Sequence, residues 1–286
     1  MSIREFSWKT AQGLKIYAAE WPHQQPQGVV GLIHGIGEHC RRYDEMGQAL
    51  QAAGYAMIGY DRQGFGRSEG KRGFVEKFSY FYDEIAQLIL ECERKYPDLP
   101  VFLYGHSMGG NLLLSYLIRR KPQIAGAVAS APYISLPFKV NPITLNMGRL
   151  MRRVYPAFTV SNQVDNTLLS RSPGVGEAML ADPHSHDKVS SIVGIDMMKT
   201  AARLDEFEGR VTIPLLIMHG DADGLTSFSA SEAFSNRVAA PSMEFKAWPG
   251  LYHELHNEPE RQEVFTYVTN WLDRHLVDAE RKLKSV

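Results

Sequence analysis

Short apolar segments alternate along the chain with longer segments of helical period, and this alternation constrains the fold more than any other feature. The short segments are rich in β-branched and aliphatic residues, which indicates strands over residues 28–34, 55–61, 101–106, 125–131, 213–220 and 242–248. Most of them are apolar at nearly every position, a pattern typical of strands that are covered on both faces. The sequence therefore predicts an α/β protein with a mostly parallel central sheet flanked by helices.

The longer segments complete this pattern. They predict helices over residues 43–53, 80–95, 109–120, 227–238 and 259–275. Near the amino terminus, residues 5–10 and 14–21 flank a Gln12-Gly13 turn and predict a hairpin. A chain of 286 residues is long enough for one large domain with a sizeable core.

One region interrupts the alternation. Between residues 131 and 213 lie roughly eighty residues with no convincing strand, several polar turns and two or three helical segments. A structureless loop of that length is improbable inside a compact domain. We therefore expect an inserted helical cap in this region.

The charge balance and the apolar runs exclude several classes of protein. The 31 basic and 32 acidic residues leave a formal charge of −1, so the chain lacks the positive charge that holds a nucleic acid. The first ten residues lack the apolar stretch of an export signal, and no run of eighteen apolar residues occurs. Cys40 and Cys92 fit reduced thiols better than a disulfide framework. We expect a cytoplasmic protein.

Two segments match the G-x-S-x-G signature of a nucleophilic serine, and their surroundings distinguish them. Residues 105–109 stand directly between a predicted strand and a predicted helix, which is the setting that exposes the hydroxyl of Ser107 on a sharp turn. Residues 66–70 lie in a glycine-rich loop after the strand ending near Asp61, with no apolar helix at once behind them. Ser107 is therefore the candidate nucleophile, and Ser68 the loop residue.

A nucleophilic serine needs a histidine base and a carboxylate that orients it, in the order Ser, Asp or Glu, His in this architecture. Asp221 and Asp223 follow one predicted strand, and His253 and His256 follow the next. Because carboxyl ends of parallel strands share one edge of a sheet, these side chains should gather near Ser107. The residues alone leave the choice within each pair open.

The oxyanion formed on attack requires two backbone donors. The N–H of Met108, which follows the nucleophile, is one candidate. The other should come from the glycine-containing loop at residues 34–39, where Ile36 is placed to offer its N–H.

Several blocks together carry a family resemblance over nearly the whole chain. The sequence resembles the monoacylglycerol lipase branch of the α/β-hydrolases, also described as lysophospholipase-like. The blocks are "HGIGEHCRRYD", "YDRQGFGRSEGKRG", "GHSMGG", "HGDADGL" and "GLYHELHNE". Phe65 departs from the pattern, since many relatives have His there, but it lies outside the catalytic blocks.

The resemblance implies roles for individual residues. Ser107 corresponds to the nucleophile, Asp223 rather than Asp221 to the acid, His253 to the base, and Ile36 and Met108 to the oxyanion donors. It also implies an α/β-hydrolase core over residues 1–135 and 204–286, and a cap over residues 136–203. The implied substrates are esters of one fatty acyl chain with a small alcohol, and no cofactor is needed.

Other functions stay open. A lysophospholipase, a general carboxylesterase and a thioesterase would share this machinery, and a hydrolase fold can also serve as a non-catalytic ligand receptor. The "HSHD" segment, His184 to Asp187, lacks further ligands at metal-binding spacing, so we expect a polar loop and no metal. No obligatory protein partner is expected.

The segment 142–155 has an apolar stripe at helical spacing, with arginines on the opposite face. The stripe comprises Ile143, Met147, Leu150, Met151 and Val154, and the arginines are Arg149, Arg152 and Arg153. Packing of the stripe over the active site is slightly favoured. The alternative is transient contact of the cap with a membrane surface.

Overall fold

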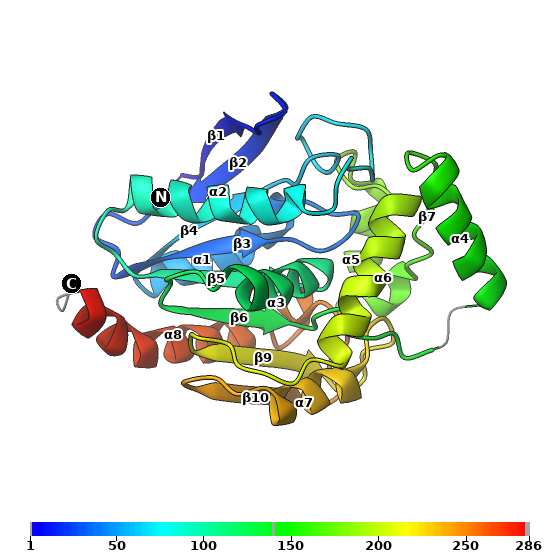
Figure 1. The fold of residues 1–286 in the computed structure, drawn as a ribbon. Helices are drawn as coiled ribbons and strands as arrows, with labels where there is room; N and C mark the ends of the chain where they lie inside the picture. Colours follow the sequence, from blue (N-terminus) through cyan, green and yellow to red (C-terminus); the bar gives the residue numbers. More distant parts are fainter. Residues whose placement is uncertain (1, 139–140, 284–286) are drawn as a thin grey trace.

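The computed structural model describes residues 2–138 and 141–283, and its centre is an eight-stranded sheet (Figure 1). The strand order is β1-β2-β4-β3-β5-β6-β9-β10, with β1 and β2 antiparallel to their neighbours and the other strands parallel. The predicted hairpin and mostly parallel sheet are confirmed. The strands are β1 (Arg4–Lys9), β2 (Lys15–Trp21), β3 (Gly28–Ile33), β4 (Tyr55–Tyr60), β5 (Val101–His106), β6 (Gly126–Ser130), β9 (Leu215–Gly220) and β10 (Met243–Trp248).

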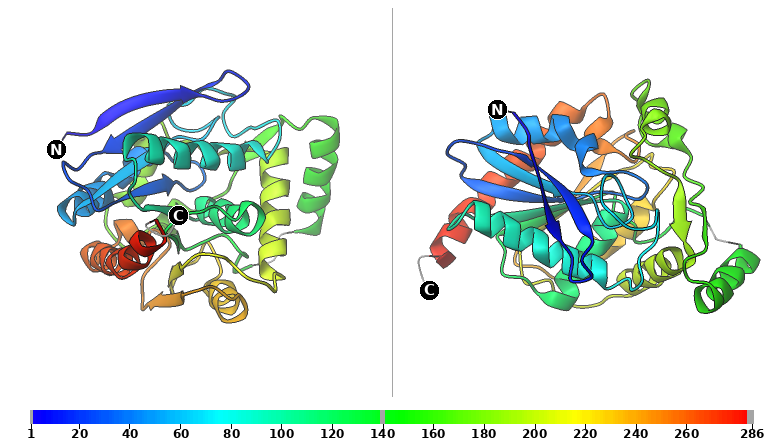
Figure 2. Two further views of the ribbon diagram at one scale, coloured as in Figure 1. Left: turned by 60° about the vertical axis from the view of Figure 1, so that its left-hand side comes forward. Right: turned by 90° about the horizontal axis from the view of Figure 1, so that it is seen from above.

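Helices cover both faces of this sheet, which explains why the central strands are apolar throughout (Figure 2). One face packs against α2 (Tyr80–Lys95), α3 (Met108–Arg120) and α7 (Phe228–Arg237). The other face packs against α1 (Asp44–Ala52) and α8 (Arg261–Leu283), with Trp271 of α8 fully buried. The helix predicted over residues 259–275 is too short, because α8 continues through a mostly charged segment in which the apolar period is weak.

The chain between β6 and β9 forms a separate layer at the carboxyl ends of the parallel strands (Figure 1). The expectation of no strand in this region is wrong. Two strands of three residues pair antiparallel, and segments so short carry no detectable period. In chain order the elements are α4 (Pro142–Val154), β7 (Thr159–Ser161), a 3-10 helix (Asn166–Leu168), α5 (Val175–Ala181), β8 (Lys188–Ser190) and α6 (Ser191–Asp205).

Two glycines of the core allow this layer to approach closely. Gly37 and Gly73 have φ angles of 74° and 70°, a region that other residues rarely adopt. A Cβ atom on Gly37 would lie 2.5 Å from the carbonyl oxygen of His186, and one on Gly73 would lie 2.2 Å from that of Lys188. Backbone hydrogen bonds cross the same contact, from His186 N to Gly37 O at 2.9 Å and from Ser190 N to Gly73 O at 2.8 Å.

The apolar stripe of α4 faces away from the molecule rather than over the active site. Its members Ile143, Met147, Leu150 and Val154 are 59 to 72% exposed. An adjoining side of the helix, which carries the half-buried Gly148 and Arg152, packs on α6, where Arg152 pairs with Asp196 at 2.7 Å. Met151, the fifth member of the stripe, is half-buried. The packed stripe that the sequence slightly favours is therefore not what the structure has.

In the described part of the chain, no helix combines the length and the apolar character needed to cross a bilayer.

Candidate active site

Ser107 occupies a strained turn between β5 and α3. Its φ and ψ of 54° and −118° are unusual for a residue with a side chain. The turn is tight enough that a Cβ atom on Gly109 would lie 2.1 Å from the carbonyl oxygen of Ile33. The N–H of Ser107 donates to the carbonyl of Ser130 at 3.0 Å, which ties the turn to β6. Ser107 lines a large cavity, to which the region between β6 and β9 also contributes lining residues.

Ser68 has a different environment. It is buried, its hydroxyl donates to the carbonyl oxygen of Asp61 at 2.5 Å, and it accepts from the N–H of Tyr17 at 2.8 Å. The bond from Tyr17 holds the glycine-rich loop against β2, and the bond to Asp61 ties it to the end of β4. Ser68 does not belong to the lining of the cavity that Ser107 faces.

Asp223 and His253 meet across the loops that follow β9 and β10. Nδ1 of His253 lies 2.7 Å from Oδ2 of Asp223. The other carboxylate oxygen accepts from the N–H groups of Leu225 and Thr226 at 2.7 and 3.0 Å. His253 is also a lining residue of the cavity, so the structure brings the His253–Asp223 pair to the space that Ser107 faces.

The pair shifts the ionisation of both groups. Burial alone would raise the pKa of Asp223, but the adjacent His253 and the hydrogen bonds from His219 and His253 hold that pKa far below its ordinary range. Burial alone would lower the pKa of His253. The charge of Asp223 outweighs this effect, so the pKa of His253 lies above its ordinary value of about 6.5.

The alternatives within each pair lie elsewhere. Asp221 is exposed and its carboxylate accepts from the N–H of Gly250 at 2.6 Å, which joins the loops after β9 and β10. His256 is buried and stacks on Tyr43, with ring centroids 4.2 Å apart. Burial lowers the pKa of His256 to about 3, so the ring is neutral.

Ile36 and Met108 both line the cavity beside Ser107. In residues 2–138 and 141–283, neither backbone N–H donates to a protein acceptor. Two such donors near one serine are what an oxyanion hole requires, but their role stays a prediction.

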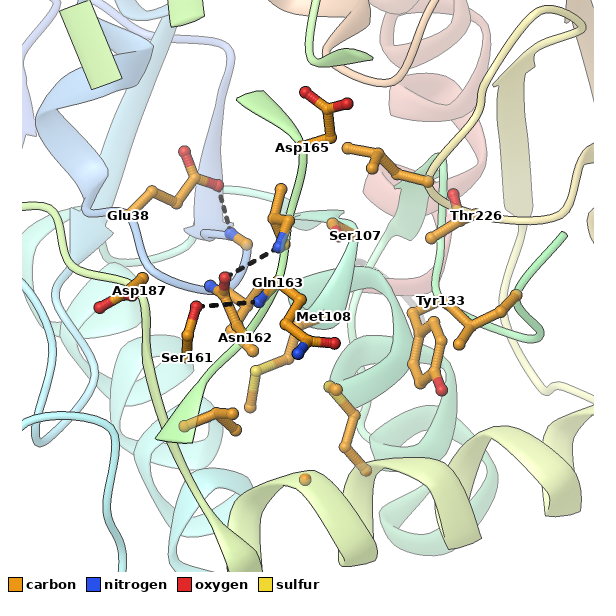
Figure 3. Close-up of a pocket in the computed structure, with 18 of the residues that line it drawn as sticks. Glu38, Ser107, Met108, Tyr133, Ser161, Asn162, Gln163, Asp165, Asp187 and Thr226 are labelled. Carbon is orange, nitrogen blue, oxygen red and sulfur yellow. Dashed lines mark hydrogen bonds between the residues drawn. The ribbon is translucent and has the colours of Figure 1, made fainter. Parts of the chain in front are cut away.

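The cavity has a volume of about 940 Å³, within the range of small-molecule sites. Apolar side chains of the region between β6 and β9, among them Leu145, Ile195 and Met198, form part of its wall. Polar side chains of β7 and the following loop, Ser161, Asn162 and Gln163, lie across from Ser107 and Met108 (Figure 3). The space therefore offers both apolar and polar walls.

Sequence analysis missed two donors to Asp223. Thr226 donates its hydroxyl to Oδ2 at 2.8 Å, and Nε2 of His219 lies 2.9 Å from the same oxygen. Nδ1 of His219 lies 2.8 Å from the hydroxyl of Ser231, and both residues are fully buried. His219 is the first residue of the "HGDADGL" block, so the sequence shows that it lies four residues before Asp223. The sequence does not show that its side chain points toward the Asp223 carboxylate.

A buried ionic cluster beneath the cavity was also missed. Arg42 pairs with Glu38 at 2.8 Å and with Glu254 at 2.6 Å, which joins the loop carrying Ile36 to the loop carrying His253. Glu38, Glu254 and His256 could offer ligand atoms to a metal ion. The guanidinium of Arg42 already donates hydrogen bonds to both carboxylates, so this donor set suits Arg42 better than a metal ion.

The "HSHD" segment contacts the core instead of gathering metal ligands. His186 stacks on Phe65 with ring centroids 5.0 Å apart, and its Nε2 lies 3.0 Å from the carbonyl oxygen of Gly64. His39 pairs with Asp182 at 2.7 Å next to His184. These contacts hold the region between β6 and β9 against the core.

Comparison with known proteins identifies the family. Residues 24–260 match the family described as serine aminopeptidase, S33. A monoacylglycerol lipase of Mycolicibacterium smegmatis is 34% identical over 274 residues, which cover 95% of this chain and 98% of the relative. The chain belongs to the monoacylglycerol lipase branch of the α/β-hydrolases.

Other members of this α/β-hydrolase branch support the assignment. A phospholipase of Bacillus subtilis is 31% identical over 90% of this chain and 99% of its own. The crystal structure of a soluble variant of monoglyceride lipase from Saccharomyces cerevisiae, in complex with a substrate analog, has a TM-score of 0.84 and 26% identity, covering 94% of each chain. The predicted fold and family are confirmed, and the protein is a carboxylic ester hydrolase.

Proposed function

We propose that the protein hydrolyses monoacylglycerols to glycerol and a fatty acid, with Ser107 as nucleophile, His253 as base and Asp223 as the orienting acid. The observation that carries this proposal is the 2.7 Å contact between His253 and Asp223 beside the cavity that Ser107 lines. The elevated pKa of His253 fits a base that accepts a proton during the reaction.

The reaction follows from this arrangement. His253 takes the hydroxyl proton of Ser107 as the serine oxygen attacks the ester carbonyl, and the N–H groups of Ile36 and Met108 receive the oxyanion. The carbonyl re-forms as the alcohol leaves with the proton from His253, which gives an acyl-enzyme. Water then repeats the cycle through the same imidazole and releases the fatty acid. The cycle uses no cofactor.

Residues 136–203 act, in this proposal, as a cap that encloses one acyl chain over the core formed by residues 1–135 and 204–286. Leu136, Leu145 and Ile195 supply apolar wall to the cavity. Monoacylglycerols should therefore be cleaved faster than triacylglycerols, whose two further chains such an enclosure would exclude.

The charges around the cavity favour a neutral alcohol. Its acidic lining residues are Glu38, Asp165, Asp187 and Glu254, and the lining contains no lysine or arginine among the residues described by the structure. An anionic head group would find no lysine or arginine among these lining residues. A lysophospholipase activity remains the second candidate, because the Bacillus subtilis relative is a phospholipase.

We further propose that the protein is cytoplasmic and touches membrane surfaces transiently through the cap, without an obligatory protein partner. The exposed stripe of α4 is flanked by the exposed Arg149 and Arg153. Phe138 and Leu180 are 61 and 74% exposed and also line the cavity. Phe138 and Leu180 thus place exposed apolar side chains at the cavity itself, which suits direct entry of a single-chain lipid.

Specific activities on a monoacylglycerol, a triacylglycerol, a lysophospholipid and an acyl thioester of one chain length test the substrate. We expect the monoacylglycerol to be cleaved fastest, and faster turnover of another member would reassign the enzyme to that class. A fluorophosphonate probe tests the nucleophile. Folded protein that refused the probe would support a non-catalytic ligand receptor instead.

A further inference from the structure

A buried arginine lies directly behind the loop that carries Ile36. Arg62 follows β4 and its side chain is completely buried. Its guanidinium donates to the backbone carbonyl oxygens of His34 and Gly35. Its carbon atom lies 5.1 Å from the ring centroid of Phe65, which helps to hold the guanidinium in place. A buried cation is therefore directed at the carbonyls of one loop.

These hydrogen bonds fix the direction of a peptide group. The carbonyl of Gly35 and the N–H of Ile36 belong to the same trans peptide, so they point in opposite directions. The carbonyl oxygen of Gly35 accepts from Arg62 and contacts Nδ1 of His34 at 2.8 Å. The N–H of Ile36 must then point away from Arg62. Ile36 lines the cavity beside Ser107, so this direction suits an oxyanion donor.

The preceding peptide is held from another side. The N–H of Gly35 donates to Oε1 of Glu38 at 2.5 Å, the dashed line that ends at Glu38 in Figure 3. The hydroxyl of Tyr43 donates to the same oxygen at 2.8 Å. A cation on the Gly35 carbonyl also polarises the peptide, which makes the N–H of Ile36 a stronger donor. Arg62 therefore contributes both to the direction and to the strength of this donor, together with the contacts of His34 and Glu38.

We propose that Arg62 is a positioning residue that aims and polarises the N–H of Ile36 toward the oxyanion of the reacting ester. This inference rests on the proposed function, because it requires Ser107 to attack an ester. It assigns to Arg62 a contribution to transition-state binding without contact with the substrate.

Arg62→Met and Arg62→Lys test the inference with a short soluble ester. Loss of one oxyanion donor costs roughly 10²- to 10³-fold in kcat, so we expect a loss approaching that range for Arg62→Met, with KM little changed. Inhibition by an alkyl trifluoromethyl ketone, which forms a tetrahedral oxyanion on Ser107, should weaken by the factor lost in kcat/KM. Binding of a non-hydrolysable alkylglycerol ether should stay unchanged.

Arg72→Met is the matched control. Arg72 donates to the carbonyl oxygens of Gly66 and Gly70 in the neighbouring loop, at 2.7 and 3.3 Å, but not to the loop of Ile36. The kcat of Arg72→Met should stay within about threefold of the wild-type value, so the activation free energy should change by less than the amount that alters the rate tenfold. If Arg62→Met does not fold, as near-ultraviolet circular dichroism would show, Arg62→Lys carries the comparison, because a lysine keeps the charge but loses the two-carbonyl fork.

Two results would overturn the role of Arg62. One is unchanged ketone inhibition in a folded Arg62 variant, and the other is an equal loss of ketone and ether affinity. Both presuppose that wild type binds the ketone tightly and that Ser107→Ala abolishes turnover. If wild type fails these two tests, the proposed function itself is wrong and the role of Arg62 falls with it.

Discussion

Asp223 accepts hydrogen bonds at both carboxylate oxygens while it lies almost fully buried. Burial makes an unpaired charge costly, so the ionised form depends on these donors. The protonation states of Asp223 and His253 therefore depend on each other, because each group stabilises the charged form of its neighbour.

The first prediction compares the two serines. Ser107→Ala should lower ester hydrolysis by several orders of magnitude, because it removes the only atom proposed to attack the carbonyl. Ser68→Ala should leave the chemistry nearly unchanged and act on stability, through the lost hydrogen bonds to Asp61 and Tyr17. Specific activity and melting temperature of both variants distinguish these effects. Substantial turnover by purified Ser107→Ala would contradict the assignment.

The second prediction concerns pH. Only the neutral imidazole of His253 accepts a proton, so activity should fall as pH decreases through the pKa of His253, which lies above 6.5. Asp223→Asn removes the charge that raises this pKa. It should lower kcat on the order of 10⁴-fold and move the acidic limb of kcat/KM to lower pH.

Asp221→Asn is the control for that change, since Asp221 bonds the N–H of Gly250 and not a histidine. Its pH profile should match wild type. A larger loss of kcat in Asp221→Asn than in Asp223→Asn would show that Asp221, and not Asp223, orients the histidine.

At this scale, order along the chain carries information. Ser107, the pair Asp221 and Asp223, and the pair His253 and His256 could be placed at strand ends, because each follows an apolar run, and the choice within each pair came from the family resemblance. The contacts of His219, Thr226 and Arg62 could not, because they depend on side-chain directions in loops that no periodicity describes. Arg62 stood inside a matched block without any sign that it points at Gly35.

At the scale of single elements, α4 differs most from the expected packing. An amphipathic helix usually turns its apolar stripe toward a core. Here Gly148, which lines the cavity, comes close to Ile195 of α6, and the stripe is left at the surface. Period alone predicts the helix but not which side is buried.

The third prediction follows from that orientation. Leu150→Asp should weaken sedimentation with anionic vesicles and lower turnover of a long-chain monoacylglycerol far more than that of a short soluble ester. Leu90→Asp on α2 is the matched control, because this substitution adds the same charge at a leucine that is also exposed, at 55%. Leu90 lies outside the region between β6 and β9. Equal vesicle binding by both variants would show that α4 does not dock.

At the scale of the whole molecule, the region between β6 and β9 contacts the rest of the chain through backbone at Gly37 and Gly73, where no room is left for side chains. Gly73→Ala should displace β8, because its Cβ would lie 2.2 Å from the carbonyl oxygen of Lys188. The positive φ at this position costs an alanine roughly 1–2 kcal/mol of folding stability. The clash with Lys188 should lower the melting temperature beyond that cost and should raise KM for long-chain esters.

Gly174→Ala is the control for this fourth prediction, because it separates the cost of the positive φ from the cost of the clash. Gly174 has a φ of 83° with no atom within 4 Å of an added Cβ, so only the conformational cost applies. The melting temperatures and long-chain KM values of both variants decide the matter. Equal effects would mean that the contact at Gly73 yields without consequence.

The region between β6 and β9 leaves the sheet and returns to it on adjacent strands. Ala127 pairs with Leu215, and the N–H of Ala131 donates to the carbonyl oxygen of Met218 at 2.7 Å. The region therefore begins and ends at neighbouring points of the sheet, and the pairing of β6 with β9 does not depend on it. During evolution, such a segment can be exchanged or reshaped as a unit while the strand ends that carry Ser107, Asp223 and His253 keep their places, so the walls of the cavity can change without a change of the sheet.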